Sequence, residues 1–336
     1  METIRLWFRH LLSFYLSVTA FLLRRLLPTL HRFPVFVPAV DSLLSHYFRS
    51  CNLSPCTVDL DDQTTMHFWA PTHRHFRKPN LVIIHGYGGN AKWQFALQVG
   101  SLARSFNLYV PDLLFFGDSR TRRPDRTDAF QAKCVMEGLV GMGVTRTAVY
   151  GISYGGFVGY RMAEMYPDVV DRVVIVSSGI ASSAEQRVEH MERLKKMGCN
   201  AADLLLPAKP EDLRRLVNLS SHKHDPFKWV PDAFLQEFIT VMYSHNRKEK
   251  QELLEYLLGN KEHDAIGSGL TQEALLLWGD KDRVFPLTFG QQLQRYLGPK
   301  ARLEVLKDAG HAANIDCPQS LNTFIKAFVL HSEGSE

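Results

Sequence analysis

The hydrophobic positions of this chain gather into short runs, each leading into a glycine, aspartate or serine. Such runs, separated by helical stretches, are typical of buried parallel strands in a βαβ sheet. They are Leu81–Ile84, Leu108–Val110, Ala148–Tyr150, Val173–Val176, Leu275–Trp278 and Leu303–Leu306. Ahead of them, Thr57–Leu60 and Thr64–Trp69 alternate around Asp61-Asp62, which indicates a β-hairpin. The pattern predicts an α/β fold with a mostly parallel central sheet flanked by helices.

The spacing of the runs breaks once, between Val176 and Leu275, where helical patterns take over. The helical ranges are Glu185–Met197, Pro210–Leu219, Pro231–Tyr243 and Lys248–Leu258. Helices inserted between two strands of one sheet explain this gap. We therefore expect an α/β core made of residues 50–179 and 269–332, interrupted by a helical cap of residues 180–268.

The N-terminal segment, residues 1–32, has a pattern of its own. Its uncharged stretch, His10–Leu23, is 14 residues long, whereas a membrane span needs about 20. Polar residues recur every four positions at Arg5, Arg9, Ser13 and Ser17, which gives a narrow polar stripe on an apolar helix. We expect a helix that lies in a membrane interface. Two alternatives stay open: a helix packed on the domain, and a signal or transit peptide.

Composition and charge narrow the class of protein. The chain is 45% hydrophobic and 22% charged, as a folded domain requires. Its net charge of +4 lies entirely in residues 1–32, which hold five arginines and one glutamate. The rest is electrically balanced, so we expect no nucleic-acid partner. We expect an intracellular protein at a membrane such as the endoplasmic reticulum, or alternatively a cytosolic one.

A serine stands where a buried strand meets a helix. Gly151-Ile152-Ser153-Tyr154-Gly155 follows the strand that ends at Tyr150, and a helix-like run, Gly156–Tyr166, comes next. A G-x-S-x-G in this context is a nucleophile elbow, in which the glycines permit a sharp turn that exposes the serine. The helix N-terminus behind it stabilises developing negative charge.

A serine nucleophile needs a base and an acid, expected downstream in the order acid then histidine. Asp282 follows the strand that ends at Trp278, and His311 follows the strand that ends at Leu306. We predict Ser153 as nucleophile, His311 as base and Asp282 as the acid that orients it. The backbone N–H groups of Tyr87 and Tyr154 are expected to form the oxyanion hole.

These motifs together resemble the α/β-hydrolase superfamily over residues of about 50–330. His85-Gly86-Tyr87-Gly88, the serine elbow, the Trp278–Pro286 turn and Gly310-His311 stand in the family's order. The resemblance implies that Asp282 rather than Asp280 is the acid. Because the turn after Ile84 is expected to act through its backbone N–H groups, His85 is expected to be structural. Serine at position 153 disfavours the epoxide hydrolases and haloalkane dehalogenases of this family, which use an aspartate. The elbow and cap are most similar to plant capped hydrolases and bacterial meta-cleavage-product hydrolases.

The chemistry implied is hydrolysis of a hydrophobic carboxylic ester, an aromatic ester or an acylglycerol, through an acyl-enzyme. The alternatives are C–C bond hydrolysis of the meta-cleavage type and a hydrolase-like receptor for a small molecule. We expect no cofactor and no metal, since His73, His75, His222 and His224 have no clear third ligand. Aromatic and apolar cap residues are candidates for the substrate pocket. They are Phe227, Trp229, Phe234, Phe238 and Met242.

Overall fold

The computed structural model describes residues 34–196, 204–259 and 269–330. Each predicted apolar run forms a strand, and the predicted hairpin is present. The strands are β1 (Leu53–Asp59), β2 (Thr64–Pro71), β3 (Asn80–Ile84), β4 (Asn107–Pro111), β5 (Arg120–Thr121), β6 (Thr147–Ile152), β7 (Val170–Val176), β8 (Glu273–Gly279) and β9 (Ala301–Leu306).

The strands form a single sheet in the order β1-β2-β4-β3-β6-β7-β8-β9, with β5 paired to β2. Neighbours from β4 through to β9 run parallel, whereas β1, β2 and β5 are joined by antiparallel pairing. The central strands β3, β4, β6 and β7 are buried along most of their length. Burial on both faces explains why their sequences are continuous apolar runs. The predicted fold class is confirmed.

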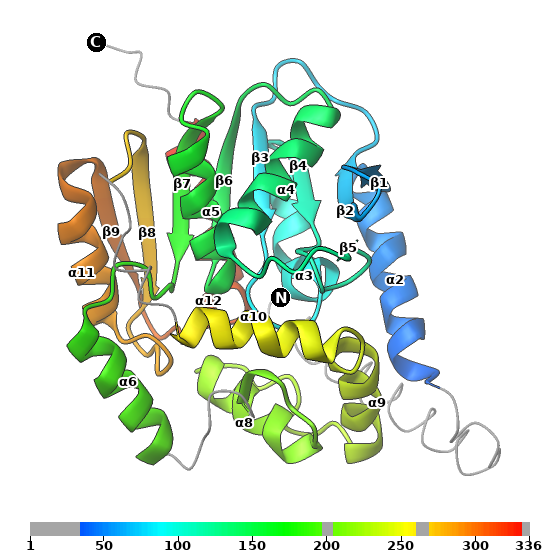
Figure 1. Ribbon diagram of the computed structural model, residues 1–336, viewed down its shortest axis with the longest axis vertical. Helices are drawn as coiled ribbons and strands as arrows, with labels where there is room; N and C mark the ends of the chain where they lie inside the picture. The colour runs from blue at the N-terminus through cyan, green and yellow to red at the C-terminus, as the bar shows by residue number, and fades with distance from the viewer. Residues whose placement is uncertain (1–33, 197–203, 260–268, 331–336) are drawn as a thin grey trace, which may run out of the picture.

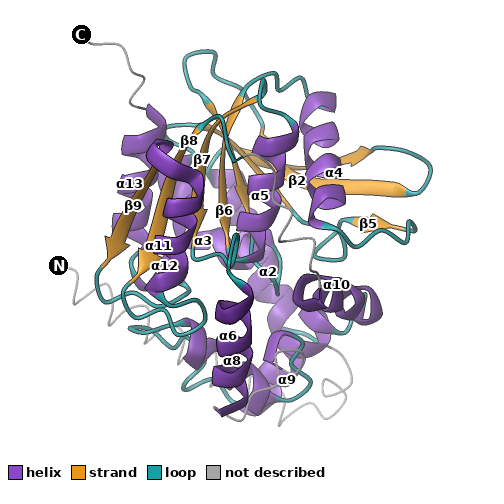
Figure 2. Cartoon of the chain, turned by 60° about the vertical axis from the view of Figure 1, so that its left-hand side comes forward, coloured by secondary structure: helices purple, strands orange, loops and turns teal. Residues whose placement is uncertain are grey.

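Helices cover both faces of this sheet (Figure 1, Figure 2). Helices α4, α5 and α11 pack into one apolar cluster, and α3 and α13 pack into the cluster on the opposite face. Their bounds are α3 (Ala91–Leu102), α4 (Asp128–Gly141), α5 (Tyr154–Met165), α11 (Leu287–Leu297) and α13 (Pro318–Leu330). A short helix, α12 (Ala313–Asp316), precedes α13.

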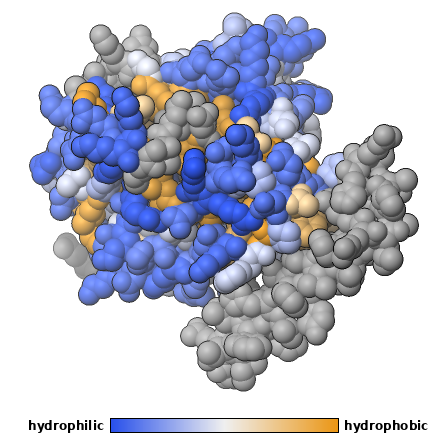
Figure 3. Space-filling model, turned by 90° about the horizontal axis from the view of Figure 1, so that it is seen from below, coloured by the Kyte–Doolittle hydropathy of each residue, from blue (hydrophilic) through white to orange (hydrophobic). Residues whose placement is uncertain are grey.

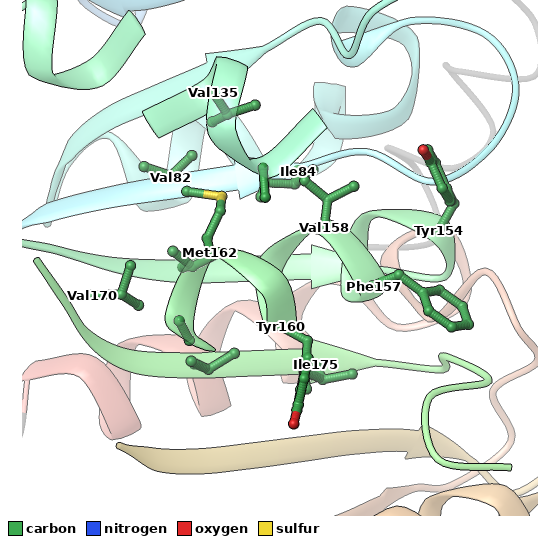
Figure 4. Packing of buried hydrophobic residues seen from close by; sticks show 14 of the residues in the cluster. Val82, Ile84, Val135, Tyr154, Phe157, Val158, Tyr160, Met162, Val170 and Ile175 are labelled. Carbon is green, nitrogen blue, oxygen red and sulfur yellow. The ribbon is translucent and has the colours of Figure 1, made fainter. Parts of the chain in front are cut away.

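The packing of α5 positions the serine at its N-terminus. Figure 4 shows Val158 and Met162 of α5 pointing toward Val82 and Ile84 of β3. All four side chains are fully buried, and each contributes roughly 1.5–3 kcal/mol by leaving water. The helix is therefore held firmly across the sheet, and its first turn has little freedom to move.

The predicted helical insertion lies between β7 and β8. It contains α6 (Ala184–Lys196), α8 (Pro210–Ser220), α9 (Asp232–Tyr243) and α10 (Arg247–Gly259). Figure 1 shows these helices gathered at the end of the sheet to which the parallel strands point. The four predicted helices of this region are confirmed, while the exact division into residues 50–179, 180–268 and 269–332 stays a prediction.

A helix that the sequence did not predict, α2 (Phe36–Ser50), joins core and cap. It contacts α3 of the core and α9 of the cap. The N–H of Val37 donates to Glu237 in α9 at 2.7 Å, and Asp41 accepts from Lys92 and Trp93 of α3 at 2.5 and 3.1 Å. Pro38 stands in the first turn, where its missing N–H removes no helical hydrogen bond.

The proposed interfacial segment, residues 1–32, lies outside the described residues and stays a prediction. Within the described ranges, no helix is both long enough and apolar enough to cross a membrane.

Candidate active site

Ser153 occupies a strained turn between β6 and α5. Its φ of 55° and ψ of −116° lie in a region that side-chain-bearing residues rarely adopt. The turn is tight enough that a Cβ on Gly155 would overlap the backbone oxygens of Ile84 and His85. Glycine is therefore required at this position. The predicted elbow geometry is present, with Ser153 directly before the first turn of α5.

The site lies where the sheet changes its direction of winding. The chain moves from β3 outward to β4 and from β6 outward to β7, so the loops after β3 and β6 diverge. Ligands bind in the crevice at such a switch point. A Cβ on Gly86 would lie 3.2 Å from the Cβ of Ser153, which brings the loop after β3 against the serine.

The predicted acid, Asp282, follows β8, and the predicted base, His311, follows β9. Nδ1 of His311 lies 3.2 Å from Oδ2 of Asp282. The other carboxylate oxygen of Asp282 accepts the N–H groups of Val284 and Phe285 at 2.8 and 2.9 Å. The buried carboxylate is thus fixed by its own turn. Because it binds Nδ1 of the imidazole, Nε2 is the ring nitrogen left to exchange protons. Asp280 instead pairs with Lys281 at 3.3 Å.

The serine and the histidine line one cavity of about 510 Å³. Ser153, His311, Tyr87 and Tyr154 all line it. Among the described contacts there is no hydrogen bond between Ser153 and His311. Catalytic hydrogen bonds of unliganded enzymes often form only when substrate binds, so this arrangement is compatible with a serine and a histidine that engage when a ligand is bound.

The two predicted oxyanion donors flank the serine. Tyr154 is the first residue of α5, where a helical N–H has no partner inside the helix. Gln94 braces the turn that contains Tyr87: its side chain accepts from the Gly86 N–H at 2.9 Å and donates to the Gly88 carbonyl at 2.5 Å. The Tyr87 hydroxyl donates to the carbonyl of Lys250 in α10 at 2.7 Å. The cap therefore helps to hold the turn that contains Tyr87.

Among the described residues, both ring nitrogens of His85 contact backbone groups. Its Nδ1 lies 2.7 Å from the Gly86 carbonyl, and its Nε2 accepts the N–H of Leu113 at 2.9 Å. One nitrogen donating and one accepting describes a neutral ring. Burial, which lowers the pKa of His85, keeps the ring in that state. This agrees with the structural role that the sequence suggested.

Of the five candidate pocket residues, two line the cavity and three do not. Phe227 and Phe238 line it. Phe234 and Met242 are buried inside the cap instead, and Phe234 packs on Phe36 of α2 at 4.6 Å. The placement of Trp229 in the pocket is wrong, because the residue is 84% exposed and lies beside Lys228.

Much of the cavity wall consists of aliphatic cap residues that the sequence did not single out. They include Leu194, Leu204, Leu205, Leu213, Leu216 and Val217. The helical spacing of apolar residues shows that a helix has an apolar face. It does not show whether that face lines a cavity or packs on another helix. Two polar residues of α6, Arg187 and His190, also line the cavity and were missed.

A further acid, Asp316, connects the loop of His311 to the cap. Oδ2 accepts the N–H groups of Gly310 and His222, both at 2.8 Å. Oδ1 accepts from the Ser221 hydroxyl at 2.7 Å and from the N–H groups of Lys223 and His224 at 2.9 and 3.2 Å. One buried carboxylate therefore takes five donors, four from the cap and one from the residue before His311.

One group of possible metal ligands occurs among the described residues, at His67, Asp112 and Asp118. Asp112 accepts from Nδ1 of His67 and from the N–H of Ala91, each at 2.9 Å, and from the N–H of Asp118 at 3.3 Å. These bonds are made within the protein and brace the turn after β4, so the group is explained as scaffold.

Comparisons with known proteins agree with this geometry. The alpha/beta hydrolase fold family matches residues 79–318. The protein named "Putative carbamate hydrolase RutD" of Cronobacter sakazakii is 28% identical over 74% of this chain and 90% of its own length. The 2-hydroxy-6-oxononadienedioate/2-hydroxy-6-oxononatrienedioate hydrolase of a Pseudomonas species is 25% identical over 74% of this chain and 87% of its own.

Among solved structures, a membrane phospholipase A described as a bacterial virulence factor superposes with a TM-score of 0.69. It is 22% identical and covers 98% of both chains, so the likeness concerns the fold alone. All three proteins are bacterial, and the resemblance to plant capped hydrolases stays a prediction.

Proposed function

Because this chain belongs to the alpha/beta hydrolase fold family, we propose that it hydrolyses hydrophobic carboxylic esters through a serine acyl-enzyme. One observation carries the proposal. A serine at a positive φ lies at a helix N-terminus and shares a cavity with a histidine that is hydrogen-bonded to a buried aspartate. These groups are the parts that acyl transfer to water requires.

The mechanism assigns one task to each group. Ser153 attacks the ester carbonyl while Nε2 of His311 takes its proton, and Asp282 stabilises the resulting imidazolium. The N–H groups of Tyr87 and Tyr154 stabilise the oxyanion. His311 then protonates the departing alcohol and activates the water that releases the acid. No step calls for a cofactor or a metal.

The cavity wall supports an apolar substrate. Most of its side chains are leucine, valine, phenylalanine or tyrosine, and Leu213, Leu216 and Phe238 come from the cap. Such a surface favours an acyl chain or an aromatic ring over an ionised group. Aromatic esters and acylglycerols are therefore the first substrates to test.

The test is a hydrolysis screen of p-nitrophenyl esters, monoacylglycerols and aromatic esters, with Ser153→Ala as control. We expect ester turnover that Ser153→Ala abolishes without a loss of folding, and His311→Ala and Asp282→Asn should also impair it. Normal esterase activity of Ser153→Ala would refute the mechanism.

A C–C hydrolase is the competing function, since the Pseudomonas relative is named for a meta-cleavage product. Product analysis separates the two reactions, because an ester yields an alcohol and an acid whereas a vinylogous diketone yields two carbon fragments. A receptor of the same fold would show ligand-dependent partner binding and negligible turnover.

A further inference from the structure

Helix α6 presents one face to the cavity. Arg187, His190, Met191 and Leu194 line it, at the spacing of one side of a helix. Two of the four are polar, in a cavity whose wall is otherwise mostly apolar. The Arg187 guanidinium donates to the Ser182 carbonyl at 2.6 Å. The protonation and hydrogen bonding of His190 depend on the residues around its ring.

Arg193 fixes the protonation of His190. Its guanidinium lies 2.9 Å from Nδ1 of His190 and donates to the Val284 carbonyl at 2.7 Å. A guanidinium can only donate, so Nδ1 must be the accepting nitrogen. Burial, together with the charge of Arg193, lowers the pKa of His190 to about 4. The ring is therefore neutral near pH 7, and its hydrogen is on Nε2.

The His190 ring lies close to the proposed base. It stacks on Phe285 with centroids 5.2 Å apart and an interplanar angle of 30°. Phe285 also packs against Phe289 at 5.4 Å and against His311 at 5.5 Å. Because His311 must protonate the departing alcohol oxygen, the alcohol half of a bound ester has to lie on this side of the cavity.

Three other polar side chains of the cavity wall already have partners in the protein. Gln94 bonds the backbone of the Tyr87 turn, Asn314 donates to the Gln94 carbonyl at 2.8 Å, and Ser221 bonds Asp316. Among the described residues, the backbone acceptor beside the His190 ring is the Val284 carbonyl, which already accepts from Arg193. With Nδ1 accepting from Arg193, the hydrogen of the neutral ring is on Nε2, and the ring lines the apolar cavity.

We propose that His190 donates a hydrogen bond to an oxygen atom on the alcohol half of the substrate. The preferred substrates are then esters of a hydroxylated alcohol, such as glyceryl esters, with the acyl chain on the apolar wall. This inference rests on the proposed ester hydrolysis and adds the recognition of the alcohol.

The test compares two esters that share an acyl group and differ in hydroxyls, 1-monooctanoylglycerol and propyl octanoate. Each is presented in the same detergent micelles, and kcat/KM is measured from octanoic acid released. We expect the wild-type protein to favour the glyceryl ester by about tenfold, which corresponds to one net hydrogen bond.

Variants of His190 should change this ratio. His190→Phe keeps an aromatic ring against Phe285 but has no donor, so it should lose the preference. His190→Gln can accept from Arg193 and still donate, so it should retain part of it. Val188→Ala alters the exposed side of the same helix and should leave the ratio unchanged. Thermal unfolding of each variant reports its folding.

The outcomes separate the two proposals. Ser153-dependent cleavage of both esters without a preference, or equal losses on both in His190→Phe, overturns the role of His190 alone. A wild-type protein that cleaves neither ester, nor any in the wider screen, overturns the proposed function and the recognition of the alcohol with it.

Discussion

Replacing Asp316 with asparagine should loosen both the cap and the loop of the proposed base. The change is almost isosteric, but it replaces one accepting oxygen with an amide that can only donate. In the protein, Oδ1 takes three donors and Oδ2 takes two. Whichever way the amide turns, at least two of these donors face another donor.

The magnitude follows from that count. A buried donor without an acceptor costs about 1–3 kcal/mol, so two cost about 2–6 kcal/mol, a large part of a typical unfolding free energy of about 5–15 kcal/mol. A drop in melting temperature on the order of 10 °C is expected. Since Gly310 adjoins His311, kcat/KM should also fall, by about tenfold or more, because small misplacements of a catalytic group are costly.

Thermal unfolding and ester kinetics measure the two effects. Asp308→Asn is the matched control, because Asp308 belongs to the same loop but its side chain is 63% exposed and lies 4.0 Å from Lys223. It should behave like the wild-type protein. If Asp316→Asn is as stable and as active as Asp308→Asn, the carboxylate does not hold the loop.

The effect of Asp316 should also depend on pH. Burial by itself would raise the pKa of this carboxyl, but the bonds from Ser221, His222, Gly310 and Lys223 outweigh it and hold the pKa below its usual value. A lowered pKa in the folded state means that the carboxylate stabilises the fold at neutral pH. That contribution is lost as the pH falls below about 4 and through the folded pKa. The stability difference between wild type and Asp316→Asn should therefore shrink in acid.

Two further predictions concern the cap and the N-terminus. Phe227→Ala should lower kcat/KM for octanoate esters by about tenfold, because it removes apolar contact worth about 1.4 kcal/mol. Trp229 is two residues away and exposed, so Trp229→Ala should leave kcat/KM unchanged. Equal losses in the two variants would contradict the placement of the cavity. Full-length protein should sediment with membranes and a variant lacking residues 1–32 should not, and a soluble full-length protein would exclude the interfacial segment.

The fold and the positions of the candidate triad could be predicted because they depend on local signals. Buried parallel strands appear as apolar runs, and Ser153, Asp282 and His311 each follow such a run. The structure brings the loops after these strands to one end of the sheet, where Asp282 meets His311. The catalytic roles of these three residues are proposals. That the three residues lie at one end of the sheet follows from the order of the strands.

Features that depend on distant contacts could not be predicted. Helix α2 was missed because Pro38 suggests a break, although proline is tolerated in a first turn. Asp316 has no local sign of its role, since its cap donors stand more than 90 positions away. Trp229 was misplaced because an aromatic residue in a loop gives no indication of which way it points. His190 is part of a highly charged helix sequence that resembles a solvated surface.

Covalent labelling tests catalysis by Ser153 most directly. The full-length protein is treated with an alkyl fluorophosphonate, which reacts with activated serines, and the intact mass and the modified peptide are measured. A single adduct on Ser153, lost together with ester hydrolysis in Ser153→Ala and slowed in His311→Ala, is the expected result. Ester hydrolysis that persists while Ser153 stays unlabelled, or an adduct confined to another residue, would contradict it.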